Sequence, residues 1–106
     1  MSVAALIVEP ENSGWYVPIA TESFFMRCWI PAIQALQLQV ISMFDPGVDI
    51  CKDELPLLLE ELDRVKMWAK IHLAEEDSGH MERRIQNLTQ RLTEIFTDEG
   101  IVVFIG

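Results

Sequence analysis

The two histidines of this 106-residue chain stand near carboxylates, a combination that can bind a metal ion. His72 precedes Glu75 and Glu76, and His80 precedes Glu82. Zinc sites use such nitrogen and oxygen ligands, but they draw them from compact motifs such as HExxH or paired cysteines, which this sequence lacks. We therefore expect no metal and no cofactor here, and we interpret these residues as a solvated connection between two helices.

Covalent catalysis would need a serine or a cysteine in a context that activates it. No candidate stands in a nucleophile elbow or in a family-specific cysteine motif, and the five glycines are isolated, so no glycine-rich loop can hold a phosphate. The candidates are Ser13, Ser23, Ser42, Cys28 and Cys51. The sequence therefore predicts a protein that is not an enzyme.

Acidic residues are concentrated in one segment. The chain has 17 Asp and Glu against 8 Lys and Arg, and residues 45–63 carry −6 of its net charge of −9. An excess of acids argues against nucleic acid as a partner, because Lys and Arg bind phosphates. It favours a basic protein drawn in by electrostatic steering, although a solvated helix face would have similar acids. The predicted contacts in this segment are Asp45, Asp49, Asp53, Glu54, Glu60 and Glu61.

Two adjacent aromatic residues, Trp15 and Tyr16, lie in a segment that we expect to be a long connection, residues 9–20. Trp and Tyr are enriched at the centres of protein interfaces, so we expect both to contact the partner. The alternative is that the segment is an apolar lid over the open end of the core.

The spacing of apolar residues predicts an α+β fold in the order β-α-β-α-α-β. Half of the residues are apolar, enough for a single domain over residues 1–106 with its own core. We expect a small three-stranded mixed sheet packed against helices that include an α-α hairpin, with a parallel crossover between the first two strands. The expected elements are strand 3–8, helix 21–36, strand 38–44, helix 53–74, helix 78–98 and strand 101–105.

Local signals refine these elements. Thr21, Asp53 and Ser78 are predicted N-caps, and Pro31 predicts a kink or break near residues 28–30. The sequence Asp45-Pro46-Gly47 predicts a turn. The unbroken apolar run at residues 3–8 is typical of a strand that is covered on both faces.

A second apolar line on helix 53–74 lies off its main apolar face and consists of Leu57, Trp68 and Ile71. It indicates a dimer seam or a partner groove. The strands at 3–8 and 101–105 have no Lys or Pro within their runs, so their edges are also open to pairing with a second copy. The alternative function is therefore a structural homodimer, or a subunit of a larger bacterial assembly, with no catalytic role.

The compartment is predicted from missing signals. The first ten residues contain no Lys or Arg and only a six-residue apolar run, which does not fit a secretory or transit peptide. No stretch reaches the roughly 18 apolar residues of a membrane span. We expect a cytoplasmic protein without a membrane partner, whose two cysteines stay reduced.

A short acidic chain with this layout and no catalytic motif resembles the bacterial immunity proteins that neutralise toxins. The likeness is one of type over the whole chain and is carried by Val17–Glu22, Asp45–Asp63 and Val102–Gly106. It implies a non-enzymatic protein that binds a basic toxin, often a nuclease, and blocks its active site. No contact residue is carried over from a family member.

Overall fold

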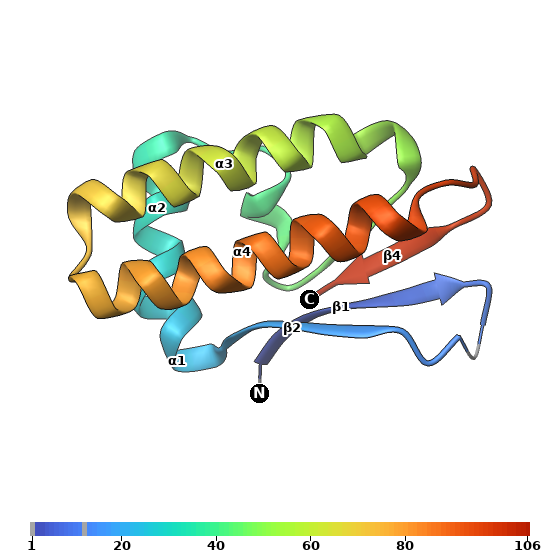
Figure 1. The fold of residues 1–106 in the computed structure, drawn as a ribbon, viewed down its shortest axis with the longest axis horizontal. Helices are drawn as coiled ribbons and strands as arrows, with labels where there is room; N and C mark the ends of the chain where they lie inside the picture. Colours follow the sequence, from blue (N-terminus) through green and yellow to red (C-terminus); the bar gives the residue numbers. More distant parts are fainter. Residues whose placement is uncertain (1, 12) are drawn as a thin grey trace.

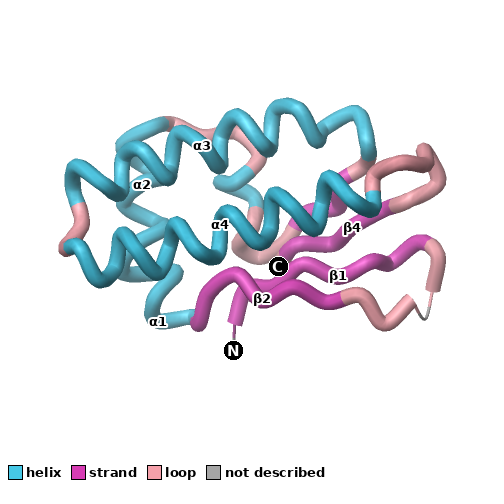
Figure 2. Tube along the Cα trace, viewed as in Figure 1, coloured by secondary structure: helices cyan, strands magenta, loops and turns pink. Residues whose placement is uncertain are grey.

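The computed structural model describes residues 2–11 and 13–106. Within these residues it is an α+β fold in which a four-stranded antiparallel sheet packs against helices (Figures 1 and 2). Met1 and Asn12, which fall in the predicted domain and the predicted 9–20 connection, lie outside the described residues. The elements are β1 (Ser2–Glu9), β2 (Tyr16–Thr21), α1 (Glu22–Phe24), η1 (Phe25–Trp29), α2 (Ile30–Leu36), η2 (Ile41–Met43), β3 (Val48–Ile50), η3 (Lys52–Glu54), α3 (Leu55–His72), α4 (Glu75–Ile95) and β4 (Val102–Ile105).

The sheet has the strand order β2-β1-β4-β3, and every neighbouring pair is antiparallel. The prediction of a three-stranded mixed sheet with a parallel crossover is therefore wrong. The strands predicted at 3–8 and 101–105 are confirmed as β1 and β4, but they are central strands. Their pairing edges are already occupied by β2 and β3, so the prediction of open edges on these two strands is wrong.

Two segments exchange the structures predicted for them. Residues 16–20, expected within a connection, form β2 together with the predicted N-cap Thr21, because Pro18 is tolerated in an edge strand. Residues 38–44, expected as a strand, form a loop and the short 3-10 helix η2. The backbone amides of this loop are held by a side chain of α3, which leaves them unable to join a sheet ladder.

The first helical segment begins and breaks where the sequence predicts. The Thr21 hydroxyl accepts a hydrogen bond from the Phe24 amide at 3.2 Å, as an N-cap does. Pro31 has no N–H to offer the carbonyl four residues back, and the preceding turn widens into the π-helix η1, in which the Ile30 amide donates to the Phe25 carbonyl.

Helices α3 and α4 form the predicted antiparallel hairpin, but both predicted caps are wrong. Cys51 rather than Asp53 precedes the helical segment, and its amide donates to the Glu54 carboxylate at 3.3 Å. Ser78 is buried inside α4, which begins three residues earlier at Glu75. Three acidic residues in that first turn favour the earlier start, because they complement the helix dipole.

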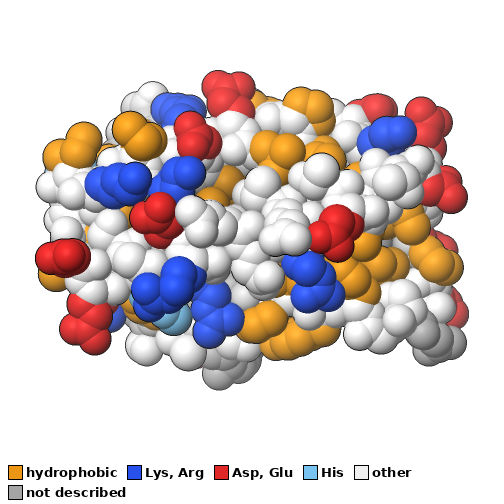
Figure 3. Space-filling view, viewed as in Figure 1, with side chains coloured by type: hydrophobic (Ala, Val, Ile, Leu, Met, Phe, Trp, Pro, Cys, Tyr) orange, Lys and Arg blue, Asp and Glu red, His pale blue; other side chains and the backbone are white. Residues whose placement is uncertain are grey.

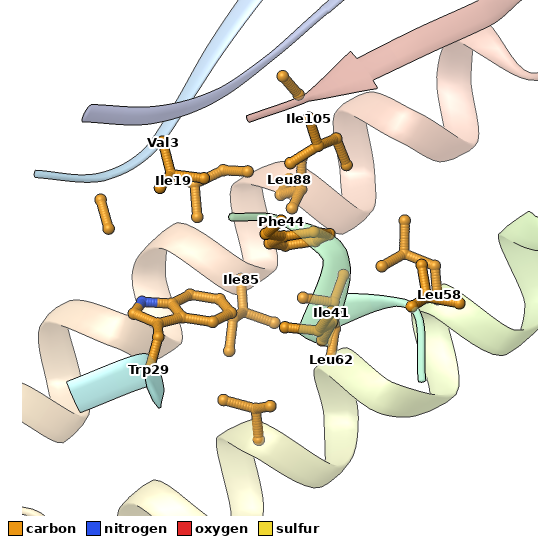
Figure 4. Close-up of a cluster of buried hydrophobic side chains, with 14 of the residues drawn as sticks. Val3, Ile19, Trp29, Ile41, Phe44, Leu58, Leu62, Ile85, Leu88 and Ile105 are labelled. Carbon is orange, nitrogen blue, oxygen red and sulfur yellow. The ribbon is translucent and has the colours of Figure 1, made fainter. Parts of the chain in front are cut away.

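One hydrophobic core fills the space between the helices and one face of the sheet. Figure 4 shows Val3, Ile19 and Ile105 pointing from the strands toward Leu88 and Phe44. In Figure 1, α3 and α4 run side by side along one side of the sheet, with α1 and α2 beyond one end of the strands. Among the described residues, no helix is long and apolar enough to span a membrane.

Candidate protein-binding surface

The face of the sheet that points away from the helices is apolar. Val3 and Ala5 of β1 belong to the core, whereas the alternating residues Leu6 and Val8 are only half-buried and do not. No helix covers this second face in residues 2–11 and 13–106. We call it the outer sheet face; its apolar side chains are Leu6 and Val8 of β1, Tyr16 and Pro18 of β2, and Val102 and Phe104 of β4.

The strand register places the largest of these side chains in one row. Leu6 is paired with Tyr16 on one side and with Phe104 on the other, and Phe104 is paired with Asp49 of β3. The Phe104 ring lies so close to the backbone that a Cβ atom added at Gly106 would stand 2.7 Å from it. The row therefore crosses all four strands and ends at a carboxylate.

The segments that build the sheet carry acids and no cations. Residues 2–21, 45–50 and 97–106 contain no Lys or Arg. Their acidic side chains, all exposed, are Glu9, Glu11, Asp45, Asp49, Asp98 and Glu99. The Lys and Arg residues all lie in helical segments, and in the view of Figure 3 they lie mainly over α3 and α4. The outer sheet face is therefore an apolar surface bordered by exposed acids, with no Lys or Arg in the same segments.

Two arginines approach the sheet, but from the helical side. Arg84 of α4 donates to the Pro18 carbonyl at 3.4 Å, and the Arg91 guanidinium lies 5.4 Å from the centre of the Trp15 ring. Because α4 packs against β2, these contacts tie the helix to the strand. They leave the outer sheet face without a cation among the described residues.

The predicted aromatic pair is split between two environments. Trp15 is half-buried against the core, under Arg91, as the lid interpretation expects. Tyr16 begins β2 and is 53% exposed on the outer sheet face. Consecutive residues of an extended chain point to opposite sides, so only Tyr16 of this pair is part of the candidate binding surface.

The predicted acidic contacts occupy different settings. Asp49 is exposed in β3, opposite Phe104 of the outer sheet face, whereas Asp45 is exposed in the predicted Asp45-Pro46-Gly47 turn and lines a pocket with Met26 of η1. Asp53 is exposed in η3, where it lines a shallow depression with Glu99 and Lys52. The partly buried Glu54 carboxylate accepts the Cys51 amide, and Glu60 is exposed on α3.

Glu61 is not a surface residue, and its prediction as a partner contact is wrong. Its side chain is 1% exposed and accepts backbone hydrogen bonds from Gln39 at 2.8 Å and from Val40 and Ile41 at 3.0 Å. A signal in the sequence points to this burial, since Glu61 stands three residues after Leu58 and four before Val65, on the apolar face of the helix.

The second apolar line on α3 is not a continuous surface. Leu57 is 37% exposed and Ile71 is 76% exposed, but they are about 21 Å apart along the helix. Trp68 is half-buried and packs against the core, with its ring stacked on the His72 ring at 4.8 Å. Arg64 lies on the same stripe and donates to the Leu36 carbonyl at 3.0 Å. A charged side chain thus interrupts the line.

The two histidines are engaged with aromatic rings. His72 stacks on Trp68, and the His80 ring meets the Phe24 ring edge-on, 4.8 Å between centres. Among the described residues, no three His, Cys, Asp or Glu side chains gather in a way that could hold a metal ion.

An ion pair that sequence reasoning missed joins η1 to the first turn of α4. Arg27 of η1 donates to Asp77 of α4 at 2.6 Å, and this hydrogen bond lowers the pKa of Asp77 below its ordinary value. The two residues are 50 positions apart, so no local pattern reveals the contact.

Cys28 is buried in the core, and Cys51 is partly exposed. Burial raises the pKa of the Cys28 thiol, which keeps it protonated and weakly nucleophilic.

Comparison with protein families, with curated proteins and with solved structures found no match to this chain.

Proposed function

We propose that this chain is a non-enzymatic protein-binding domain of the immunity or antitoxin type, which neutralises a basic, nuclease-like toxin by covering its active site. The observation that carries this proposal is the outer sheet face, an apolar surface whose strands and adjoining loops, residues 2–21, 45–50 and 97–106, carry exposed acids and no Lys or Arg. A second support is that no group of three or more His, Cys, Asp or Glu among the described residues could hold a metal ion.

The chemistry of this surface fits a nucleic-acid-binding partner. A nuclease holds phosphates with Lys and Arg, and the same side chains would pair with Asp45 and Asp49. Apolar contacts with Tyr16, Leu6 and Phe104 would supply the buried area at the centre, while the acids raise the rate of encounter. The proposal places the chain in the cytoplasm, where its free cysteines stay reduced.

The test begins with capture of a partner from extracts of the native cell, with the product of the adjacent reading frame as the first candidate. The dissociation constant of the purified partner is then measured for the triple variant Asp45→Lys, Asp49→Lys and Asp53→Lys. We expect binding about 100-fold weaker, and a smaller loss of affinity on adding salt than the natural chain shows.

A matched control makes the same change in charge on α4, at Glu75, Glu76 and Glu82. Its affinity should stay within about three-fold of the natural chain, because these residues are remote from the sheet. If both triple variants bind with unchanged affinity, or both are weakened equally, the acidic border of the sheet has no special role and the proposal fails.

A second candidate function is a structural homodimer or a subunit of a larger assembly. The observation in its favour is Ile71, whose side chain is 76% exposed near the end of α3. Sedimentation of the natural chain and of Ile71→Ser over a range of concentrations tests it. A dimer that dissociates in the variant supports this candidate, and a monomer at all concentrations removes it.

A further inference from the structure

We infer that the outer sheet face receives one amphipathic helix of the partner, with apolar side chains toward the sheet and Lys or Arg along the flank that faces β3. This inference rests on the proposed binding of a basic protein and names the part of that protein that docks. It follows from the size of the face, from its two blocked edges and from its charge.

The outer sheet face has the dimensions of a single helix. Four strands place the two outermost about 14 Å apart, and a helix with its side chains is about 10–12 Å wide. The row through Tyr16, Leu6 and Phe104 would lie beneath the helix. The exposed Asp49 lies toward one flank, in the edge strand β3, where a lysine or arginine could reach it.

A helix is also the element with which this sheet already packs. Its inner face is covered by α4, and α/β domains commonly place helices on both faces of a sheet. The apolar run of β1, Val3–Val8, has the composition of a strand covered on both sides. A helix from the partner would complete the third layer.

Addition of a strand is disfavoured at both edges. The edge strand β2 contains Pro18, which has no N–H to donate to a new neighbour. The other edge strand, β3, has only three residues. Short edge strands and proline are devices that block strand pairing, so a partner is directed to the face of the sheet.

A second copy of this chain is disfavoured by charge. A two-fold interface through the outer sheet face would bring the acidic border of one copy, including Glu9 and Asp49, against that of the other. Like charges facing each other oppose association, and no Lys or Arg in the strands offsets them. A helix with a basic flank meets the acidic β3 edge with the opposite sign.

The probe for this inference is a synthetic 14-residue peptide of Leu and Lys, patterned to place Leu on one face of a helix. The matched control peptide has Glu in place of every Lys. We expect the Leu/Lys peptide to bind and to shift the amide NMR signals of Leu6, Tyr16 and Phe104, and the Leu/Glu peptide to leave them unchanged.

Variants of the chain locate the peptide. Tyr16→Lys changes an exposed residue of an edge strand and Leu6→Lys a half-buried residue of a central one, so the first remains usable if the second does not fold. Each should weaken binding of the Leu/Lys peptide about ten-fold or more. The control Ile71→Lys adds the same charge to an exposed apolar position on α3 and should leave the affinity unchanged.

Three results would overturn the inference: shifts confined to α3 and α4, equal binding of the two peptides, or a dimer in sedimentation that Tyr16→Lys dissociates. The proposed function can survive any of them, because it depends on whether the captured partner responds to the charge reversals at Asp45, Asp49 and Asp53. Conversely, the peptide could bind the strands while the affinity of the partner is unchanged by those charge reversals. That result would support the helix site and contradict the proposed function.

Discussion

The outer sheet face and the exposed surface of the α3–α4 hairpin are both solvent-facing, but they balance charge differently. On the hairpin, acids and bases are interspersed and some are paired, as Lys66 is with Asp63 at 3.5 Å. On the sheet, the exposed acids have no cation in their own segments. The net charge of −9 is thus spread over a nearly balanced helical layer and an unbalanced sheet layer.

The two layers also differ in the polarity of the face that points away from the core. The outward face of α4 is polar, as a helix bordered by water requires. The outward face of β1 and β4 is apolar, although an open face of an antiparallel sheet is commonly polar. The prediction that strand 3–8 is covered on both faces is met by this chain on one face only. The other is the face on which we propose that a partner binds.

The largest loss of stability that we expect concerns Glu61, the acidic residue that is buried in the fold. Glu61→Ala should destabilise the fold by about 3 kcal/mol or more, because three backbone amides lose their buried acceptor. Urea unfolding measures the loss. The neighbouring Glu60→Ala, at an exposed position, should cost less than about 0.5 kcal/mol. Similar losses of unfolding free energy for the two variants would mean that the hydrogen bonds of Glu61 do not stabilise the fold.

A second effect separates the two faces of the sheet at adjacent residues of β4. Ile105→Ala, at a fully buried position of the core, should cost about 2–4 kcal/mol of the free energy of unfolding. Phe104→Ala, on the outer sheet face, should cost about half of that or less in the free chain.

Binding should reverse this order. Phe104→Ala removes a ring from the proposed contact surface, so it should weaken binding of the partner about ten-fold or more. A folded Ile105→Ala variant should bind with almost unchanged affinity. Urea unfolding and the dissociation constant of the partner are measured on the same preparations. If Phe104→Ala is the more destabilising change and leaves binding intact, the outer sheet face is ordinary core.

The part of this fold that local sequence predicts is the part whose pattern is strong over many residues. The runs at 3–8 and 101–105 become strands, and the repeated leucines and isoleucines of α3 and α4 become the helical hairpin. Thr21 and Pro31 act as predicted because a cap and a missing N–H are properties of a few adjacent residues.

The failures come from contacts between distant residues. The strand predicted at 38–44 is prevented by Glu61, some twenty positions away, whose carboxylate takes the amides that a sheet would need. Strand β2 was not predicted because Pro18 is typical of a loop, and only the position of β2 at the edge of the sheet explains why proline is tolerated there. For the candidate binding surface, the sequence predicted the acids and Tyr16, but only the strand register joins Leu6 and Phe104 to them.

The smallest expected effect tests whether the helical layer balances its charges through specific pairs. The hydrogen bond from Arg27 lowers the pKa of Asp77 below its ordinary value of 3.8, so the pair stabilises the fold above that pH. The contribution is lost as the pH falls through the lower pKa of the folded chain. Thermal midpoints of the natural chain and of Asp77→Asn should therefore differ slightly at pH 5 and converge near pH 2. The control Glu76→Gln removes a carboxylate from the same helical turn but keeps the pair, so it should retain the pH dependence of the natural chain. A gap between the natural chain and Asp77→Asn that is the same at both pH values would mean that the pair adds nothing, and that the helical layer is balanced only on average.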